Sequence, residues 1–329
     1  MLAPRPFGPT GRSVSPLGFG AWAIGGTWGE VTEADAVAAL SAALDGGVDF
    51  IDTADVYGDG RSERIIGRVL ATRSGPRPFV ATKAGRRIAP HVAETYTRET
   101  LEAHIDRSRA NLRMDCLDLV QLHCPPGPVY DSARVFDAML AIREAGKIAQ
   151  FGVSVERIDE AEKAIAYPGV ISVQIIYNLF RQRPADSFFA AAAAKGVAII
   201  ARVPLASGLL TGKMTATSSF AADDHRTFNR NGEAFDKGET FSGVPYDVAL
   251  QAVDALRPLV PQGAAMAAFA LRWILMEQAV TVVIPGSKSP AQSVGNAAAL
   301  SLPALSPETM TAAREVYARL IAPHVHGLW

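Results

Sequence analysis

The sequence predicts an α/β fold, a (β/α)8 TIM barrel that forms a single domain over residues 1–329. Short apolar runs alternate with stretches of helical periodicity along most of the chain, which is typical of repeated βα units. The runs are apolar throughout rather than alternating, as in parallel strands that are buried on both faces. Eight such runs in a chain of 329 residues favour a closed barrel over an open sheet.

The expected elements follow one another in chain order. A hairpin at residues 5–15, with its turn at 8–11, precedes a first strand at 17–20. Further strands are expected at residues 48–51, 79–82, 117–122, 151–153, 170–173, 197–201 and 281–284. Helices are expected at residues 32–45, with Thr32 as the N-cap, then at 62–70, 98–112, 132–145, 158–165 and 184–195. An extra C-terminal helix is expected at residues 307–321.

Residues 211–246 interrupt this rhythm. They show no periodicity and are rich in Ser, Asp, Asn and Gly. A loop of this length inside a compact domain is usually functional or mobile. We therefore expect a mobile loop that contributes to a cofactor or substrate site.

Composition limits the classes of function. Lys and Arg total 32 and Asp and Glu total 33, so no basic surface is available to attract nucleic acid or an anionic membrane. The two cysteines, Cys116 and Cys124, are too few for a disulfide framework. Residues 1–12 lack the apolar core of a signal peptide, and no run of apolar residues is long enough to span a bilayer. We expect a cytoplasmic protein and leave its oligomeric state open.

Two other kinds of site are disfavoured. Gly18, Gly20 and Gly25 resemble a dinucleotide-binding glycine fingerprint, but that motif requires a helix to open directly on the glycines. Residues 25–29 cannot begin a helix, so a Rossmann fold is not expected. The histidines lack the spacing of metal ligands, and no metal site is expected.

Polar residues stand where three consecutive predicted strands end. These residues are Asp52, Lys83 and His123, and Tyr57 follows Asp52 in a glycine-bearing loop. A lysine ammonium beside a phenol lowers the pKa of that phenol from its usual value of about 10, and a carboxylate holds the lysine in place. Such a phenol can act as a general acid, and a neutral histidine can donate a hydrogen bond to a carbonyl oxygen. Taken singly, a structural salt bridge and a core histidine would also explain these residues.

The motifs that carry these residues are Ile51-Asp52-Thr53-Ala54-Asp55-x-Tyr57-Gly58, Thr82-Lys83 and Gln121-Leu122-His123. With them the chain resembles the aldo-keto reductases over essentially its full length. The resemblance implies a barrel without a Rossmann fold and a nicotinamide cofactor extended over the strand ends. It also implies that Asp52, Tyr57, Lys83 and His123 form the catalytic tetrad, with Tyr57 transferring the proton during hydride transfer to or from a carbonyl carbon.

The same resemblance implies the cofactor-binding residues. Ser154 and Gln174 match positions that hold the nicotinamide carboxamide, and Val155 stands where the family usually has Asn. Arg202 stands where many members stack an aromatic ring on the nicotinamide, and its charge is expected to disfavour the oxidised cofactor. The remaining implied residues cover the pyrophosphate or hold the adenosine end: Pro204, Leu205, Ser207, Leu210, Lys213, Gly286, Ser287, Lys288, Gln292 and Asn296. Trp22 and Trp28 are the candidates for lining the substrate pocket.

The adenosine end also bears on the choice of cofactor. Ser289 as N-cap and Pro290 at the first helical position predict a helix N-terminus that can bind an anion, and Lys288 adds a positive charge. No acidic residue lies between Gly286 and Asn296 to repel a phosphate. We expect NADPH to be preferred, with NADH possible, because a lysine replaces the bidentate fork of an arginine.

Two functions of different classes remain. The first is an NAD(P)H-dependent oxidoreductase that acts on a small aldehyde, ketone or alcohol. The second is a redox-sensing regulatory subunit similar to the potassium-channel β-subunits, which resemble this family and turn over little substrate. The sequence favours the enzyme, because no N-terminal extension that could act as a channel plug is evident.

Overall fold

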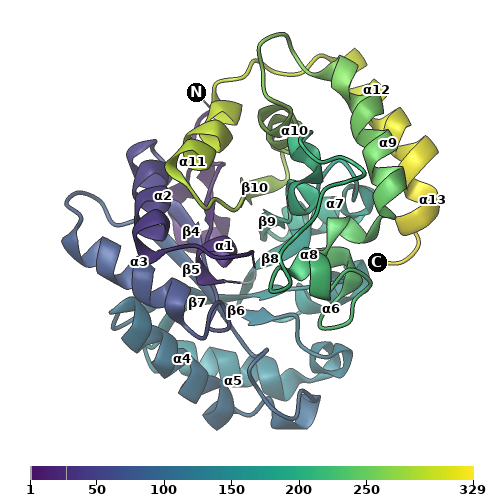
Figure 1. Cartoon of the computed structure of the whole chain (residues 1–329). Helices are drawn as coiled ribbons and strands as arrows, with labels where there is room; N and C mark the ends of the chain where they lie inside the picture. Colours follow the sequence, from purple (N-terminus) through teal and green to yellow (C-terminus); the bar gives the residue numbers. More distant parts are fainter. Residues whose placement is uncertain (1, 27) are drawn as a thin grey trace.

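The computed structural model describes residues 2–26 and 28–329, in which eight parallel strands form one curled sheet (Figure 1). The strands pair in chain order: β3 (Phe19–Gly20), β4 (Phe50–Asp52), β5 (Phe79–Ala84), β6 (Leu117–His123), β7 (Ile148–Ser154), β8 (Val170–Ile176), β9 (Ala198–Arg202) and β10 (Val280–Val283). Parallel bridges join Leu17 to Val283 and Gly20 to Gly286, and Gly18 N donates to Val283 O at 2.8 Å. These contacts close the sheet, which confirms the predicted (β/α)8 barrel.

Helices surround the barrel (Figure 1). The helix α2 begins after Thr32, whose side chain accepts a hydrogen bond from Asp35 N, so the predicted N-cap is confirmed. The helices in this ring, with short irregular turns omitted, are α2 (Glu33–Asp45), α3 (Arg61–Thr72), α4 (Arg98–Leu112), α5 (Ala133–Glu144), α6 (Ile158–Ala164), α7 (Phe188–Ala194), α9 (Tyr246–Leu256), α10 (Met266–Leu275) and α11 (Pro290–Ala297).

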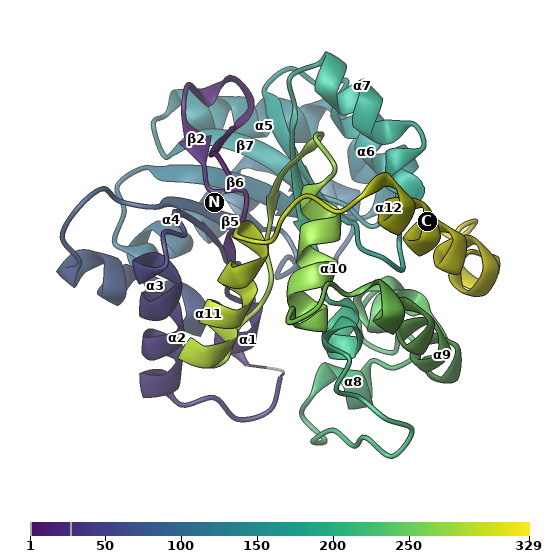
Figure 2. The same cartoon turned by 90° about the horizontal axis from the view of Figure 1, so that it is seen from above.

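The predicted N-terminal hairpin is present and closes one end of the barrel. Its strands β1 (Arg5–Pro6) and β2 (Ser13–Val14) pair antiparallel. Between them Phe7 is fully buried, with ring centroids 5.4 Å from Phe50 and 4.9 Å from Phe79, two residues of the barrel interior. Figure 2 shows the hairpin at one end and the short helices α1 (Trp22–Gly25) and α8 (His225–Phe228) at the other. Only that second end is free to carry a site, as is usual for the carboxyl ends of barrel strands.

Several boundaries differ from the prediction. Strand β5 continues past Lys83 to Ala84, and β8 continues past Gln174 to Ile176, so neither residue terminates its strand. The short helix α1, which was not predicted, follows β3. Helices α9 and α10 were not predicted. In α10 nine of the ten residues are buried, so it lacks the exposed polar face of a surface helix. The C-terminal helix α12 (Pro307–Val316) passes through a π-helical turn into α13 (Ala322–Val325).

The aperiodic segment 211–246 carries only short helical turns, and apart from Phe241 and Val244 its buried side chains are polar. Asn229 is fully buried, donates to Thr240 Oγ1 at 3.1 Å, and accepts from the backbone nitrogens of Ala234 and Phe235. Because hydrogen bonds of this kind hold the segment together, its sequence shows no hydrophobic periodicity from which its structure could be predicted.

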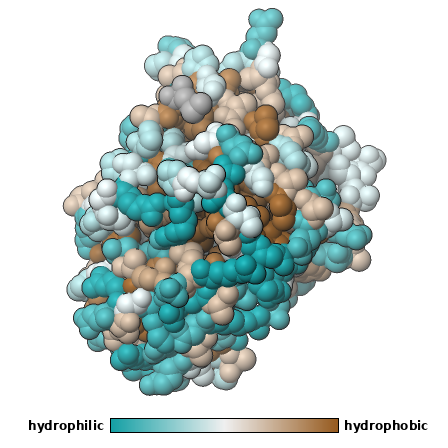
Figure 3. Space-filling view, turned by 90° about the vertical axis from the view of Figure 1, so that its left-hand side faces the viewer, coloured by the Kyte–Doolittle hydropathy of each residue, from teal (hydrophilic) through white to brown (hydrophobic). Residues whose placement is uncertain are grey.

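The outer face seen in Figure 3 is mostly hydrophilic, with small apolar areas between the polar side chains. Among the described residues, no helix is both long enough and apolar enough to cross a lipid bilayer.

Candidate active site

A buried lysine joins three residues at the open end of the barrel. Lys83 Nζ donates to Asp52 Oδ2 at 2.7 Å, to the carbonyl oxygen of Thr53 at 2.8 Å and to Tyr57 Oη at 3.2 Å. Both Lys83 and Asp52 are almost inaccessible, at 0% and 3% exposure. The parallel pairing of β4, β5 and β6 brings them together from strands that are consecutive in the chain.

Asp52 is held on its other side by amide groups. Gln174 Nε2 donates to Asp52 Oδ1 at 2.7 Å, and Gln121 Nε2 donates to the same atom at 3.5 Å. A buried ion pair is tolerated only when its remaining lone pairs are satisfied. The two glutamines meet that condition for Asp52, so the carboxylate is a fixed counter-charge for Lys83.

The charges of these groups follow from their surroundings. Burial lowers the pKa of Lys83, but Asp52 and Tyr57 outweigh that effect and the pKa is raised, so the ammonium form persists. Burial raises the pKa of Tyr57 above its usual value, and the neighbouring Lys83 opposes this only in part. We expected the lysine to lower the phenol pKa. In the structure burial is the larger effect, and Tyr57 keeps its proton at neutral pH.

His123 lies beside the phenol, with ring centroids 6.0 Å apart and the rings nearly perpendicular. Burial, followed by the positive charges of Arg86 and Lys83, lowers the pKa of His123 well below its usual range. The ring is therefore neutral. Its Nδ1 is buried without a hydrogen-bond partner among the described residues, so the neutral ring keeps the capacity to bond one further group.

Two glycines bring the loop of Tyr57 against α1. Gly58 has φ near 58°, and a Cβ there would collide with the carbonyl group of Gly25. This close approach lets Trp22 of α1 stack on Tyr57, with centroids 6.1 Å apart and an interplanar angle of 17°. Trp28 meets Trp22 edge-on at 5.5 Å. The two tryptophans predicted to line the substrate pocket thus stand beside the phenol.

A cavity of about 610 Å³ runs from the phenol to the N-terminus of α11. Most predicted site residues line it: Trp22, Trp28, Asp52, Tyr57, His123, Ser154, Gln174, Arg202, Pro204, Leu205, Ser207, Lys213, Gly286, Lys288, Gln292 and Asn296. Three do not. Lys83 lies beneath the wall, Leu210 packs into the core, and Ser287 is buried against Asn296.

The far end of the cavity is built around α11. Ser289 caps the helix and Pro290 begins it, as predicted. Gln292 Oε1 accepts from Lys288 N at 2.7 Å, and Asn296 Nδ2 donates to Ser287 Oγ at 3.0 Å, so both side chains also brace the preceding loop. Lys288 Nζ donates to the carbonyl oxygen of Trp28. The lysine therefore links the two sides of the cavity mouth.

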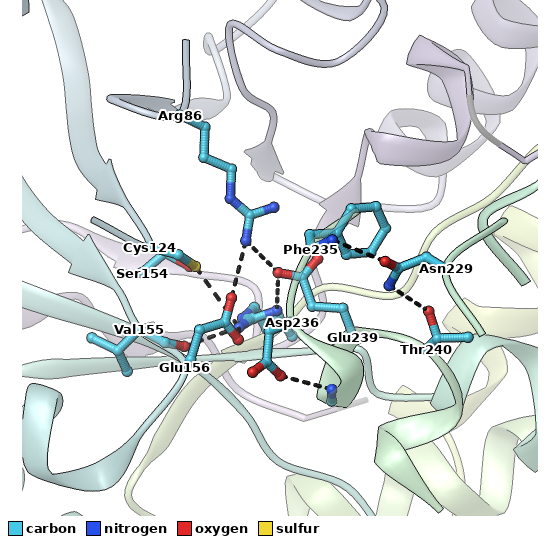
Figure 4. Close-up of polar contacts among 12 residues, drawn as sticks. Arg86, Cys124, Ser154, Val155, Glu156, Asn229, Phe235, Asp236, Glu239 and Thr240 are labelled. Carbon is cyan, nitrogen blue, oxygen red and sulfur yellow. Dashed lines mark hydrogen bonds and ion pairs between the residues drawn. The ribbon is translucent and has the colours of Figure 1, made fainter. Parts of the chain in front are cut away.

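Arg202 ends β9 on the cavity wall. We expected its positive charge to be uncompensated, but two carboxylates pair with it. Its guanidinium lies 2.7 Å from Glu156 Oε2 and 3.3 Å from Glu239 Oε1. Arg86 contacts the same two carboxylates at 3.0 and 2.5 Å (Figure 4). Strand-end reasoning missed this pairing because Glu156 and Glu239 follow no predicted strand directly.

Cys124, Glu156 and Glu239 present ligand atoms within 4.8 Å of one another, which is a possible metal arrangement. Two observations favour an ion-pair cluster instead. Both carboxylates already face guanidinium groups, which a cation would have to displace. Burial also raises the pKa of the Cys124 thiol to about 12, whereas a metal ligand is the thiolate.

The sequence analysis also missed Arg226, which lines the cavity from α8. Its guanidinium is held by Asp224 Oδ2 at 2.6 Å and lies 5.1 Å from the ring centroid of Trp28. Arg226 and Glu239 both belong to the aperiodic segment 211–246, where no strand end marks a candidate.

The structure is thus a closed (β/α)8 barrel with a Lys–Tyr–carboxylate group at its open end. The Aldo/keto reductase family profile matches residues 16–318, and the chain belongs to this family. It is 31% identical over 295 residues to "Aldo-keto reductase YhdN" of Bacillus subtilis, covering 86% of this chain and 84% of the relative. It is also 31% identical over 322 residues to a "Probable voltage-gated potassium channel subunit beta" of Oryza sativa, covering 92% and 93%.

A solved structure shares the fold. The aldo-keto reductase from Klebsiella pneumoniae in complex with NADPH superposes with a TM-score of 0.70 and 22% identity, covering 96% of each chain.

Proposed function

We propose that the protein is an NADP-dependent oxidoreductase that interconverts a small carbonyl compound and its alcohol, with Tyr57 as the general acid or base. The observation that carries this proposal is the hydrogen-bonded series Asp52–Lys83–Tyr57, which sets a protonated phenol at the wall of a large cavity. A hydroxyl group with a fixed cationic neighbour is suited to protonate a developing alkoxide.

The cavity fits an extended dinucleotide cofactor. Its volume of about 610 Å³ and its length, from Tyr57 to the N-terminus of α11, exceed what a small carbonyl substrate needs. Besides Arg202, the cations Lys213, Arg226 and Lys288 line its wall, which suits phosphate groups. The positive end of the α11 dipole adds a further position that favours an anion. When bound, the nicotinamide would supply or accept the hydride.

The chain's own residues divide the remaining work. Tyr57 holds the proton that passes to the substrate oxygen, and Lys83 stabilises the tyrosinate left behind. His123, being neutral, can donate a hydrogen bond to the carbonyl oxygen and so orient it. Ser154 and Gln174 are assigned to the nicotinamide end, although Gln174 also serves Asp52. Trp22 and Trp28 keep water from the reacting atoms.

We further infer that NADPH is preferred over NADH. Lys288 stands half-buried at the capped N-terminus of α11, where a 2′-phosphate would meet both the ammonium group and backbone amides. Burial and the neighbouring Arg226 lower the pKa of Lys288, and Asp224 and Asp223 oppose this only in part. We also propose that residues 1–329 act as one domain and that segment 211–246 moves to admit the cofactor.

The test is steady-state reduction of 4-nitrobenzaldehyde with NADPH and with NADH. Repeated turnover that is lost in Tyr57→Phe, with NADPH favoured, supports the proposal. The alternative is a cofactor-sensing subunit, favoured by the likeness to the rice channel subunit over nearly the full chain. Tight NADPH binding with a single slow turnover would favour that alternative.

A further inference from the structure

Four charged side chains from four separate elements converge at the open end of the barrel. They are Arg86 after β5, Glu156 after β7, Arg202 at the end of β9, and Glu239 in the 3₁₀ turn Lys237–Glu239. Arg86, Glu156 and Glu239 are labelled in Figure 4. Each of the two guanidinium groups contacts both carboxylates, at N–O distances from 2.5 to 3.3 Å. The two positive and two negative groups form a closed set, which we call the mouth cluster.

Two members of the mouth cluster are buried and the other two, Arg86 and Glu156, are partly buried. Arg202 is 7% exposed and Glu239 5%. In such surroundings an unpaired charge acts on its neighbours far more strongly than at a solvated surface. Arg202 and Glu239 also both line the cavity that holds Tyr57 and Ser154. The balance of charge in the cluster therefore sets the potential at this end of the cavity.

The two carboxylates are not equivalent. Burial acts to raise the pKa of both, but Arg86 and Arg202 outweigh it at Glu239, whose pKa is lowered. At Glu156 burial prevails and the pKa is raised. Glu239 is thus the carboxylate that remains ionised at neutral pH. It is also the one supplied by the segment 211–246, which Ser207 Oγ anchors by donating to Glu239 O at 3.1 Å.

We propose that Glu239 is a specificity-determining residue, which sets the preference of the site between the oxidised and reduced cofactor by cancelling the charge of Arg202. The inference rests on the proposed function, since it requires the nicotinamide to lie beside Arg202. The oxidised nicotinamide ring is a cation and the reduced ring is neutral. An uncompensated guanidinium at the wall repels only the first.

The test compares the dissociation constants of NADP⁺ and NADPH, measured by fluorescence titration of the full chain. Glu239→Gln keeps the shape of the side chain and removes its charge. We expect it to weaken NADP⁺ about tenfold more than NADPH, the scale of one charge uncompensated at short range and partly screened. Glu233→Gln removes the same charge from an exposed position of the same segment, where the carboxylate contacts Asn231. It should leave the ratio of the two constants unchanged.

Two more variants separate charge from structure. Arg202→Met removes one positive charge from the cluster and should shift the ratio the opposite way, toward NADP⁺. The double variant Glu239→Gln/Arg202→Met should return the ratio close to that of the wild type. A merely structural role would weaken both cofactors equally in every variant, and this result would overturn the inference.

The same measurements distinguish failure of the proposed function from failure of the proposed role of Glu239. If the wild type binds neither cofactor, the function itself is wrong. If the wild type binds and turns over but the ratio does not respond to Glu239→Gln or to Arg202→Met, only the role of Glu239 is wrong. Because Arg202→Met tests the same charge balance independently, a Glu239 variant that fails to fold leaves the inference open to refutation.

Discussion

Replacing Asp55 by Asn should stabilise the protein at alkaline pH and not at acid pH. Asp55 is fully buried under α3 and α4, and neither carboxylate oxygen has a hydrogen-bond partner among the described residues. His104 Nδ1 lies 3.6 Å from Oδ2, beyond hydrogen-bond distance. Burial, reinforced by the negative charge of Glu63, raises the pKa of Asp55 from 3.8 to about 7.

The size and sign of the effect follow from proton linkage. Below pH 3.8 the folded and unfolded states both hold the proton, so the carboxyl group is tolerated. Between 3.8 and about 7 only the folded state holds it, and the free energy of unfolding falls as the pH rises. Each pH unit in that window is worth about 1.4 kcal/mol. Only the two pH units from 5 to about 7 contribute between these conditions. Allowing for local relaxation, we expect Asp55→Asn to gain about 2 kcal/mol near pH 8 relative to its effect near pH 5.

Urea denaturation followed by circular dichroism at both pH values measures this difference. Asp59→Asn is the matched control, because Asp59 lies in the same loop but is 68% exposed and pairs with Arg107 and Arg87. Its hydrogen bond to Arg107 lowers the pKa of Asp59, so this variant should not gain stability as the pH rises. An Asp55→Asn effect that is equal at the two pH values would show that Asp55 is ionised in the folded protein.

Three other variants test the site and the barrel. Tyr57→Phe should lower kcat by about 10²–10⁴ and leave the Kd of NADPH nearly unchanged; retention of a tenth of the activity would exclude Tyr57 as proton donor. Lys288→Ala should weaken NADPH by about 1–3 kcal/mol and NADH much less in a binding titration, whereas equal losses would remove Lys288 from the 2′-phosphate site. Phe7→Ala should cost about 3–5 kcal/mol in urea denaturation with kcat preserved, because Phe7 packs at the closed end of the barrel; a large loss of kcat would contradict this separation of stability from catalysis.

The sequence predicted those features that depend on a local pattern of residue types. Apolar runs located all eight strands, because strands buried on both faces must be apolar. The carboxyl ends of those strands identified the positions of Asp52 and His123, and Ser289 and Pro290 marked the start of α11. Each of these signals is local, since it needs only the residues next to it in the chain.

The sequence did not predict features that depend on contacts between residues far apart in the chain or on burial in the folded protein. The charge of Arg202 is balanced by Glu156 and Glu239, and no pattern in the chain links these three residues. The phenol pKa was misjudged because burial, which the chain does not reveal locally, outweighs the contact with Lys83. Helix α10 was overlooked because nine of its ten residues are buried, so no exposed polar face marks it as a surface helix.

The closure of the barrel has a consequence for biosynthesis. The sheet becomes continuous only when Leu17 pairs with Val283, so residues near the two ends of the chain must meet before any edge is covered. Until β10 leaves the ribosome, the nascent chain holds an open sheet whose edge strands β3 and β9 expose unpaired backbone groups. Such edges invite association between chains. Slower synthesis or a lower growth temperature should therefore improve the soluble yield by favouring closure of the barrel, which is complete at residue 283. The C-terminal helices add no strand to the barrel and should affect the yield less.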